Sequence, residues 1–394
     1  MEEHKFFIGR IIKTFGQLVR VIDIEHNNGQ IVYRLEHPIV TPNIEYTRDY
    51  VYENEIQKIM KKFTEIEQFR NVIHAVKSRH DYTGRDENDD ATYSHTSPYP
   101  TLKFRGTTKL HGTNSAIVAH VVSPDVIAYE FQSRENVLSL EADNAGFMRA
   151  MLGKNYGKLF AGIKFNESCA IYGEWCGQGI QGGVGISKLP KMLVIFAVRI
   201  DDVYQDMENF KHIHINDEGI YNIMQFPYHT IEIDFNNPEL VQNILIGLTM
   251  EVERECPVAK HFGISGIGEG LVWEYINGNE RFIMKVKGEK HQNSKVKTLT
   301  TVDVEAIQNI KNFIEYAVTE NRLLQGIDKM KEMRIPLDTK STADYLRWVY
   351  NDVVKEELDT IKANGIDEKK IGSAVSAKAR IFWLNYLNTN LNEI

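Results

Sequence analysis

The sequence has 394 residues, of which 42% are hydrophobic and 25% charged, and its formal net charge is −8. This length exceeds one ordinary core, so two or three domains of a soluble globular protein are expected. The negative charge of the whole chain argues against nucleic acid as a partner unless basic side chains cluster locally.

Other features indicate the setting of the protein. The N-terminus, MEEHKFFIGRII, carries acidic residues where a signal peptide would be basic, and no apolar run reaches the roughly 20 residues that span a bilayer. The three cysteines, Cys169, Cys176 and Cys256, are too few and too scattered for a disulfide framework or a closed zinc site. A cytoplasmic protein without membrane contact is therefore expected.

The N-terminal residues 1–52 are expected to form a small β-rich module. Apolar positions alternate on both sides of Asn27-Asn28-Gly29. An Asn-Gly pair supplies the positive φ angles that a tight hairpin requires. The next segment, 53–79, changes to helical spacing, with Ile56, Met60 and Phe63 on one face.

The middle of the chain is mostly β structure. The polar residues 80–100 predict a mobile surface loop. Strand-length runs of β-rich composition follow at 116–122, 126–133, 169–175, 192–200, 270–276 and 281–287. Helical pieces are expected at 142–161 and 237–247.

From about residue 300 the apolar spacing is helical. Ser341 and Asp344 predict a capping box, and a last helix is expected over 367–388. The predicted domains are therefore a β-rich module (1–52), a central domain (53–298) and a helical C-terminal domain (299–394).

Polar or aromatic side chains interrupt the apolar runs of the central domain. Lys109 lies in TTKLHGTN, Glu174 in GEW, Phe196 in IFAV and Glu269 in EGLV. A carboxylate in an apolar strand is costly to bury without a partner, which favours a functional interpretation of the two glutamates. Phe196 taken alone is more commonly an ordinary core residue.

The basic stretch 284–297 contains Lys285, Lys287 and three further lysines. A bare run of this kind is usually a solvated loop. A nucleophilic lysine must be neutral, however, and nearby cations disfavour the ammonium form. Lys285 and Lys287 could therefore both activate Lys109 and hold a triphosphate.

The motifs in order are Lys-x-His-Gly (109–112), Gly-Glu (173–174), Phe196, Glu-Gly-x-Val (269–272) and Lys-x-Lys (285–287). This series resembles the covalent nucleotidyltransferases, which include polynucleotide ligases and mRNA capping enzymes. His111, where most DNA ligases and capping enzymes carry Asp, is similar to the ATP-dependent RNA ligase 2-like family, as is the run GEWCGQGIQ. The resemblance covers about residues 105–290.

The resemblance implies an α+β fold. A nucleotidyltransferase (ATP-grasp-like ligase) domain of antiparallel sheets with helices would follow the β-rich module and precede the helical domain. It also implies three reactions: Lys109 takes AMP from ATP, AMP passes to an RNA 5′-phosphate, and a 3′-hydroxyl displaces it. A role in RNA repair follows, with Mg²⁺ as the metal ion and Mn²⁺ able to substitute.

Roles for single residues also follow from the resemblance. Phe196 and Val272 would sandwich the adenine. The ribose contacts would come from Asn114, Arg134 and Glu174. The predicted catalytic residues are Lys109, His111, Glu269, Lys285 and Lys287. The predicted metal ligands are Glu269 and Glu174.

The expected partner is RNA, as free ends or a nicked duplex, and a monomer is expected. Lys369, Lys370, Lys378 and Arg380 could contact phosphates, although a basic helix packed on its neighbour is an equal alternative. Two other functions stay open: a DNA ligase or GTP-dependent capping enzyme of the same superfamily, and a catalytically silent RNA-binding protein.

Overall fold

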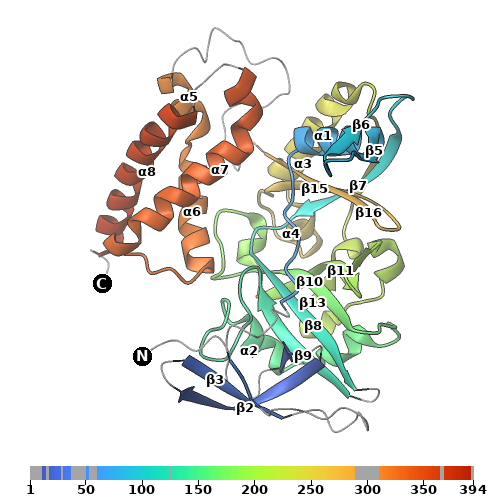
Figure 1. Ribbon diagram of the computed structural model, residues 1–394, viewed down its shortest axis with the longest axis vertical. Coiled ribbons are helices and arrows are strands. Elements are labelled where there is room, and N and C mark those ends of the chain that lie inside the picture. The colour runs from blue at the N-terminus through green and yellow to red at the C-terminus, as the bar shows by residue number, and fades with distance from the viewer. Residues whose placement is uncertain are drawn as a thin grey trace. The chain divides into compact units, whose positions relative to one another are not determined.

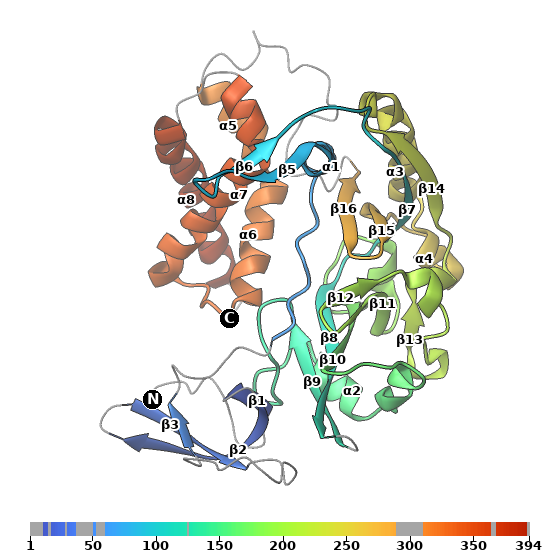
Figure 2. The same ribbon diagram turned by 45° about the vertical axis from the view of Figure 1, so that its right-hand side comes forward.

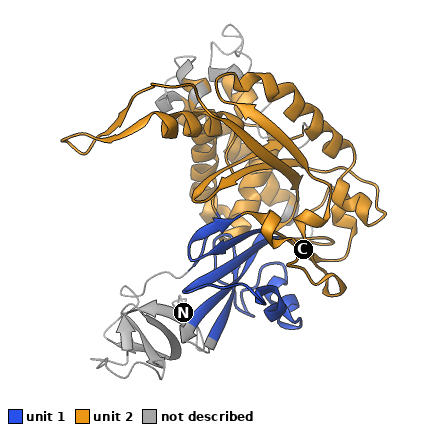
Figure 3. Cartoon of the chain, turned by 90° about the vertical axis from the view of Figure 1, so that its right-hand side faces the viewer, with its two compact units in different colours: residues 1–63, 114–173, 197–205 blue, residues 64–113, 174–196, 206–394 orange. Residues whose placement is uncertain are grey.

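The structure is a computed structural model that describes residues 11–14, 17–27, 30–36, 50–52, 60–123, 126–288, 310–363 and 368–391. The chain divides into two compact units (Figure 3). Unit 1 holds Met1–Phe63, Asn114–Gly173 and Ala197–Gln205, and unit 2 holds Thr64–Thr113, Glu174–Phe196 and Asp206–Ile394. The domain boundaries expected from the sequence stay a prediction.

The N-terminal segment is an antiparallel sheet of four strands in the order β1-β2-β3-β4. The strands are β1 (Ile11–Thr14), β2 (Gln17–Asn27), β3 (Gln30–Glu36) and β4 (Tyr50–Tyr52). Asn27 pairs with Gln30, as a tight hairpin requires, while Asn28 and Gly29 lie outside the described residues. The predicted β structure of this stretch is confirmed.

A second sheet runs in the order β12-β11-β10-β8-β9, and β13 pairs with β11 off this path. Its strands are β8 (Thr113–Ser123), β9 (Val126–Ser133), β10 (Ser168–Cys176), β11 (Met192–Ile200), β12 (Val203–Gln205) and β13 (Ile220–Asn222). The predicted strands at 116–122, 126–133, 169–175 and 192–200 all lie within it.

A third sheet, in unit 2, has the order β14-β7-β15-β16 and is entirely antiparallel (Figure 2). It contains β7 (Thr101–Lys109), β14 (His229–Asp234), β15 (Gly270–Asn277) and β16 (Glu280–Lys287). Side chains alternate between its faces, and one face carries a core that includes Phe104, Trp273 and Met284. Two helices contribute to that core, α1 (Phe69–Asp81) and α3 (Gln242–Arg254).

The helix predicted over 53–79 is wrong over residues 60–68 and confirmed from Phe69. Residues 60–68 are not helical, and 53–59 lie outside the described residues. Glu67 instead donates its N–H to the Ile283 carbonyl and accepts from the Lys285 N–H, at 3.2 and 2.8 Å. These bonds satisfy the open edge of β16, and this tertiary pairing outweighs the local helical spacing.

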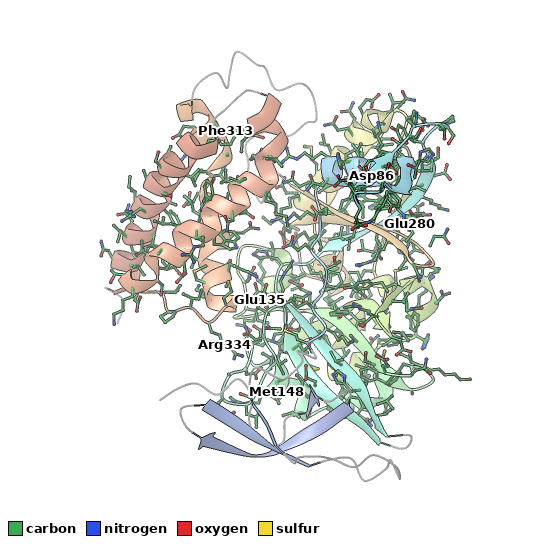
Figure 4. The ribbon with its side chains drawn as sticks, in the orientation of Figure 1. Asp86, Glu135, Met148, Glu280, Phe313 and Arg334 are labelled. Carbon is green, nitrogen blue, oxygen red and sulfur yellow. The ribbon has the colours of Figure 1, made fainter. Side chains whose placement is uncertain are left out.

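The segment 80–100, expected as a loop, contains a small hairpin. Strands β5 (Tyr82–Arg85) and β6 (Ala91–Tyr93) pair antiparallel. Asp86 begins the turn and accepts hydrogen bonds from the N–H groups of Asn88 and Asp90 (Figure 4). The turn-rich composition therefore correctly indicated the turn between the two strands, but the short strands themselves were not predicted.

Shorter helices complete the central part of the chain. The α-helices are α2 (Phe147–Leu152) and α4 (Pro257–His261). The 3-10 turns are η2 (Tyr156–Phe160), η3 (Gly185–Lys188), η4 (Met207–Phe210), η5 (Asn216–Glu218), η6 (Ile223–Gln225) and η7 (Pro238–Val241). The helical pieces predicted at 142–161 and 237–247 correspond to α2 with η2 and to η7 with α3.

The C-terminal part is helical, as predicted (Figure 1). Its elements are α5 (Ile310–Ala317), α6 (Glu320–Glu332), η9 (Thr339–Ser341), α7 (Thr342–Ala363) and α8 (Glu368–Leu391). Their shared core includes Phe313, labelled in Figure 4, and the stacked rings of Tyr345 and Trp383, whose centroids lie 4.5 Å apart. The α+β class expected from the sequence is confirmed.

Two polar features of this bundle were not predicted from the sequence. Asp338 caps the 3-10 turn η9 by accepting from the N–H groups of Lys340 and Ser341, so the helical run opens before α7 and Ser341 lies inside it. Arg322 is completely buried on α6 and donates to Asp352 and Glu356 on α7, at 2.8 and 2.9 Å. No helix in the described parts of the chain has the length and apolar character needed to cross a bilayer.

Candidate active site

Three strands of the third sheet end together at one point. Lys109 is the last residue of β7, Gly270 the first of β15 and Lys287 the last of β16. Gly270 pairs with Lys109 on one side and with Lys287 on the other. Directly opposed residues of antiparallel strands face the same side, so both lysines project from one face of the sheet.

Glu269, immediately before β15, joins these lysines. The Lys109 Nζ donates to Glu269 Oε2 at 2.8 Å, and the Lys287 Nζ lies 3.2 Å from Oε1. His111 Nδ1 is 3.2 Å from Oε2. The side chain of Glu269 is only 4% exposed, so a buried carboxylate is balanced by three nitrogen groups.

These contacts set the ionisation of the cluster. Burial opposes the charge on Glu269, but Lys109, Lys287 and His111 together hold its pKa well below the usual value. Burial lowers the pKa of Lys287 to about 8, an effect that Lys109 and Lys285 reinforce and Glu269 opposes. Lys287 thus stays mostly protonated at neutral pH but loses its charge at a lower pH than an exposed lysine does.

Two glycines fix the backbone around the cluster. Gly270 has φ +148°, and a Cβ there would lie 2.2 Å from the Val286 carbonyl oxygen. A Cβ on Gly112 would lie 2.4 Å from the Trp175 carbonyl oxygen. Side chains are therefore excluded at both positions, which holds the strand ends of Lys109 and Lys287, and the turn carrying His111, close to their neighbours.

Lys285 and Val272 lie one step further along the same face. Val272 pairs with Lys285 on β16 and with Thr107 on β7, and Lys285 is two residues from Lys287. With a period of two, Val272, Lys285 and the two lysines at the strand ends share one side of the sheet. The register thus brings together the Lys-x-Lys and Glu-Gly-x-Val motifs.

No sequence motif indicates that Lys285 has a partner on the C-terminal helices. Glu356 on α7 accepts from the Lys285 Nζ at 3.2 Å and also binds Arg322. Burial opposes the charge of Glu356, yet Lys285 and Arg322 lower its pKa to about 2. A helix in which acidic and basic side chains are mixed carries no periodic signal for such a contact.

Glu174 and Phe196 occupy distinctive positions in their strands. Glu174 is the one position of β10 that is not fully buried. Phe196 follows four buried residues of β11 and is itself half-buried. Both belong to unit 2, as Lys109 does. Their burial suits side chains that lie at the margin of a core, and their predicted roles stay predictions.

The other predicted residues are less well placed. Asn114 and Arg134 belong to unit 1 and are half-buried, so their ribose contacts stay predictions. Of the basic stretch 284–297, the residues after 288 lie outside the described part of the chain.

One comparison with known proteins indicates a family. Residues 102–287 match the family model described as RNA ligase. No curated protein sequence matches the chain. Two solved structures of Naegleria gruberi RNA ligase, one with PPi and one of a variant with ATP and Mn, are each 17% identical to this chain. Each match covers 71% of this chain and 78% of the other, and the TM-scores are 0.36 and 0.38. A variant with AMP and Mn has 17% identity, the same coverage and a TM-score of 0.39.

The family match, and not these low-scoring structural likenesses, carries the assignment. The matched segment contains Lys109, His111, Glu269 and the Lys-x-Lys pair, and it ends at Lys287. Over residues 102–287, just under half of its length, the chain is similar to the RNA ligase family, a family of enzymes that join RNA.

Proposed function

We propose that the chain is an ATP-dependent RNA ligase in which Lys109 carries AMP. The observation that carries this proposal is the cluster in which the Nζ atoms of Lys109 and Lys287 lie 2.8 and 3.2 Å from one buried carboxylate, Glu269. A structural ion pair needs one cation for one carboxylate. A second lysine and a histidine at the same carboxylate suit a site that exchanges partners when a polyanion enters.

The first reaction forms a phosphoramidate. The neutral Nζ of Lys109 attacks the α-phosphorus of ATP, the bond to the bridging oxygen of the β-phosphate breaks, and pyrophosphate leaves. Lys285 and Lys287, on the same face of the sheet, would bind the phosphate oxygens and stabilise their charge in the transition state. Phe196 and Val272 would hold the adenine between them.

Two further reactions join the RNA. An oxygen of the RNA 5′-phosphate attacks the phosphorus of the bound AMP, and Lys109 is released. A 3′-hydroxyl then attacks the 5′-phosphorus of the second end, and AMP leaves as the phosphodiester forms. The substrates are RNA ends with these groups, free or at a nick in a duplex, and the setting we propose is RNA repair.

Glu269 fits a divalent metal ion. Its carboxylate stays ionised despite burial, and a hydrated Mg²⁺ needs few protein oxygens. The ion, or Mn²⁺ in its place, would supply positive charge at the phosphates and weaken the hold of Glu269 on the Lys109 proton. Glu174 is the second carboxylate proposed for it, and His111 would help to orient Glu269.

Ligation assays test this function. The protein is given ATP labelled at the α-phosphate, with Mg²⁺, and then nicked RNA duplexes or single-stranded RNA ends. We expect an acid-labile protein adduct whose label moves to RNA, followed by sealing. Adduct formation with GTP instead would indicate a capping enzyme, and sealing of DNA alone a DNA ligase. No adduct with either nucleotide would contradict the proposal and favour a silent RNA-binding protein.

A further inference from the structure

We propose that His80, Asp81 and His95 form a binding site for a divalent transition-metal ion, with zinc as the best match. These residues lie in unit 2, outside the Glu269 cluster. His80 and Asp81 end α1, and His95 follows the β5–β6 hairpin. The proposal is therefore independent of the proposed ligase reaction.

The three potential ligand atoms already converge. His80 Nδ1 lies 3.0 Å from Asp81 Oδ1, and His95 Nδ1 lies 2.9 Å from the same oxygen. All three atoms are within 4.8 Å of one another. Tetrahedral ligands at the usual zinc distances of roughly 2.0 to 2.1 Å are separated by about 3.3 Å. The two distances from Asp81 Oδ1 would therefore need to widen by about 0.3 to 0.4 Å to admit the ion.

Neighbouring side chains orient the ligands in the way that metal sites require. Ser97 Oγ lies 3.2 Å from His80 Nε2, the ring nitrogen that faces away from Asp81 Oδ1. Tyr99 donates its hydroxyl to Asp81 Oδ2 at 3.0 Å, which directs the other oxygen toward the histidines. Ligating histidines and carboxylates commonly have such partners on their second polar atom, which fix the tautomer and the orientation.

Aromatic neighbours also hold both histidine rings in place. The rings of His80 and Tyr99 have centroids 5.2 Å apart. The rings of His95 and Tyr99 have centroids 4.4 Å apart. Both contacts reduce the rearrangement that metal binding would need.

The donor set selects the kind of ion. Two imidazole nitrogens and one carboxylate oxygen suit Zn²⁺ and related transition metals, whereas Mg²⁺ and Ca²⁺ prefer oxygen ligands. Three protein ligands leave a fourth position for water. The bound ion would fasten residues 94–99 to the end of α1, beside the 2.7 Å hydrogen bond from the Ser94 N–H to the Asp81 carbonyl oxygen.

Zinc binding to the full-length, tag-free protein tests the proposal. The protein is stripped with chelator, then titrated with Zn²⁺ in excess Mg²⁺, which occupies oxygen-rich sites. The main variant is His95→Ala, because the His95 side chain is 51% exposed and its loss should not impair folding. His74→Ala is the matched control, since His74 lies on the same helix but bonds Ser78 Oγ at 3.3 Å.

We expect the wild-type protein and the His74→Ala variant to bind one equivalent of zinc and to gain thermal stability from it. His95→Ala and Asp81→Asn should each lose that equivalent and the gain in melting temperature. Equal zinc uptake by wild type and His95→Ala would overturn the proposal, because the ion would then lie elsewhere. So would the absence of tight binding by the wild-type protein, which would leave a hydrogen-bonded triad.

Discussion

At the scale of single residues, Gly270 determines how closely the two lysines approach Glu269. Gly270 lies between Lys109 and Lys287 in the strand register. It tolerates no side chain, because its φ is +148° and an added Cβ would lie 2.2 Å from the carbonyl oxygen of Val286. The position of the cluster is thus a property of the backbone.

The Gly270→Ala variant should therefore lose both stability and adenylylation. Strain and overpacking should cost about 2 kcal/mol or more in the free energy of unfolding. The control is Gly247→Ala in α3, where nothing lies within 4 Å of the added Cβ and the helix should gain up to about 1 kcal/mol. Urea unfolding and ATP labelling measure both effects. A fully stable, fully active Gly270→Ala variant would show that this constraint is not needed.

Lys287 is expected to act on the phosphates of ATP without carrying AMP. Lys287→Ala should slow the first reaction on the order of 100-fold, as the loss of a preorganised charge does. Lys285→Ala should slow it in the same direction. Single-turnover labelling with ATP measures the rate, and Lys260→Ala serves as the control because that lysine pairs with Glu255 at the surface. An unchanged rate in both variants would assign the Lys-x-Lys motif a structural role.

At the scale of elements, α7 contributes a carboxylate that the ligase motifs do not include. Glu356 binds Lys285 from the sheet and Arg322 from α6. Arg322 is also held by Asp352 at 2.8 Å, so one buried guanidinium links three helical positions. A buried charge network of this kind is costly to break on one side.

This network predicts how stability depends on pH. Lys285 and Arg322 lower the pKa of Glu356 from 4.5 to about 2 against the effect of burial. Its contribution is therefore complete above 4.5 and is lost as pH falls toward 2, and by linkage it amounts to roughly 3 kcal/mol at most. Burial and the charge of Glu356 raise the pKa of Asp352. The contribution of Asp352 to the free energy of unfolding therefore decreases as pH rises, opposite to that of Glu356.

Glu356→Gln should flatten the loss of unfolding free energy over that pH range. Denaturant unfolding of wild type and variant, followed by far-ultraviolet circular dichroism at each pH, compares the slopes. Glu239→Gln is the control, because Glu239 is exposed at the start of η7. Parallel curves for wild type and Glu356→Gln would contradict the role assigned to the network.

Strands were the elements that the sequence predicted best. The runs at 192–200 and 281–287 lie on β11 and β16, because their β-branched and aromatic content agrees with their buried positions. The segment 60–68 was mispredicted, since its backbone pairs with the edge of β16 through Glu67, a contact absent from local spacing.

In the candidate site, too, the residues within sequence motifs were predicted and those joined only by tertiary contacts were not. Motif order indicated Lys109, Glu269 and Lys287, and the strand register brings them together. Glu356 could not be predicted, because its partner lies 71 residues away on a different kind of element. The His80 and His95 cluster was hidden for a related reason, since a hairpin brings two ordinary histidines to one carboxylate.

At the scale of the whole molecule, a chain of net charge −8 that acts on RNA as proposed would have to bind it through local groups of cations. On α8, Lys378 pairs with Glu315 at 3.2 Å, whereas Arg380 is exposed. Lys369 and Lys370 lie where side chains are not described. Arg380 is therefore the described residue of this group best placed to reach phosphates.

Arg380→Ala should weaken RNA binding and sealing while leaving the protein–AMP adduct unchanged. Loss of one phosphate contact should also reduce the slope of log affinity against log salt by about 1. Arg347→Ala, another exposed arginine, which pairs with Asp344, is the control. Equal RNA affinity in wild type and Arg380→Ala would favour the alternative of a basic helix that only packs on its neighbours.

The central claim is that Lys109 is the residue that carries AMP, and mapping the adduct tests it most directly. The protein is incubated with ATP and Mg²⁺, digested, and searched by mass spectrometry for the AMP-modified peptide. We predict AMP on Lys109 alone, and no adduct in a folded Lys109→Ala variant, in which Glu269 keeps Lys287 and His111 as partners. AMP on another residue, or an adduct that persists in Lys109→Ala, would contradict the account.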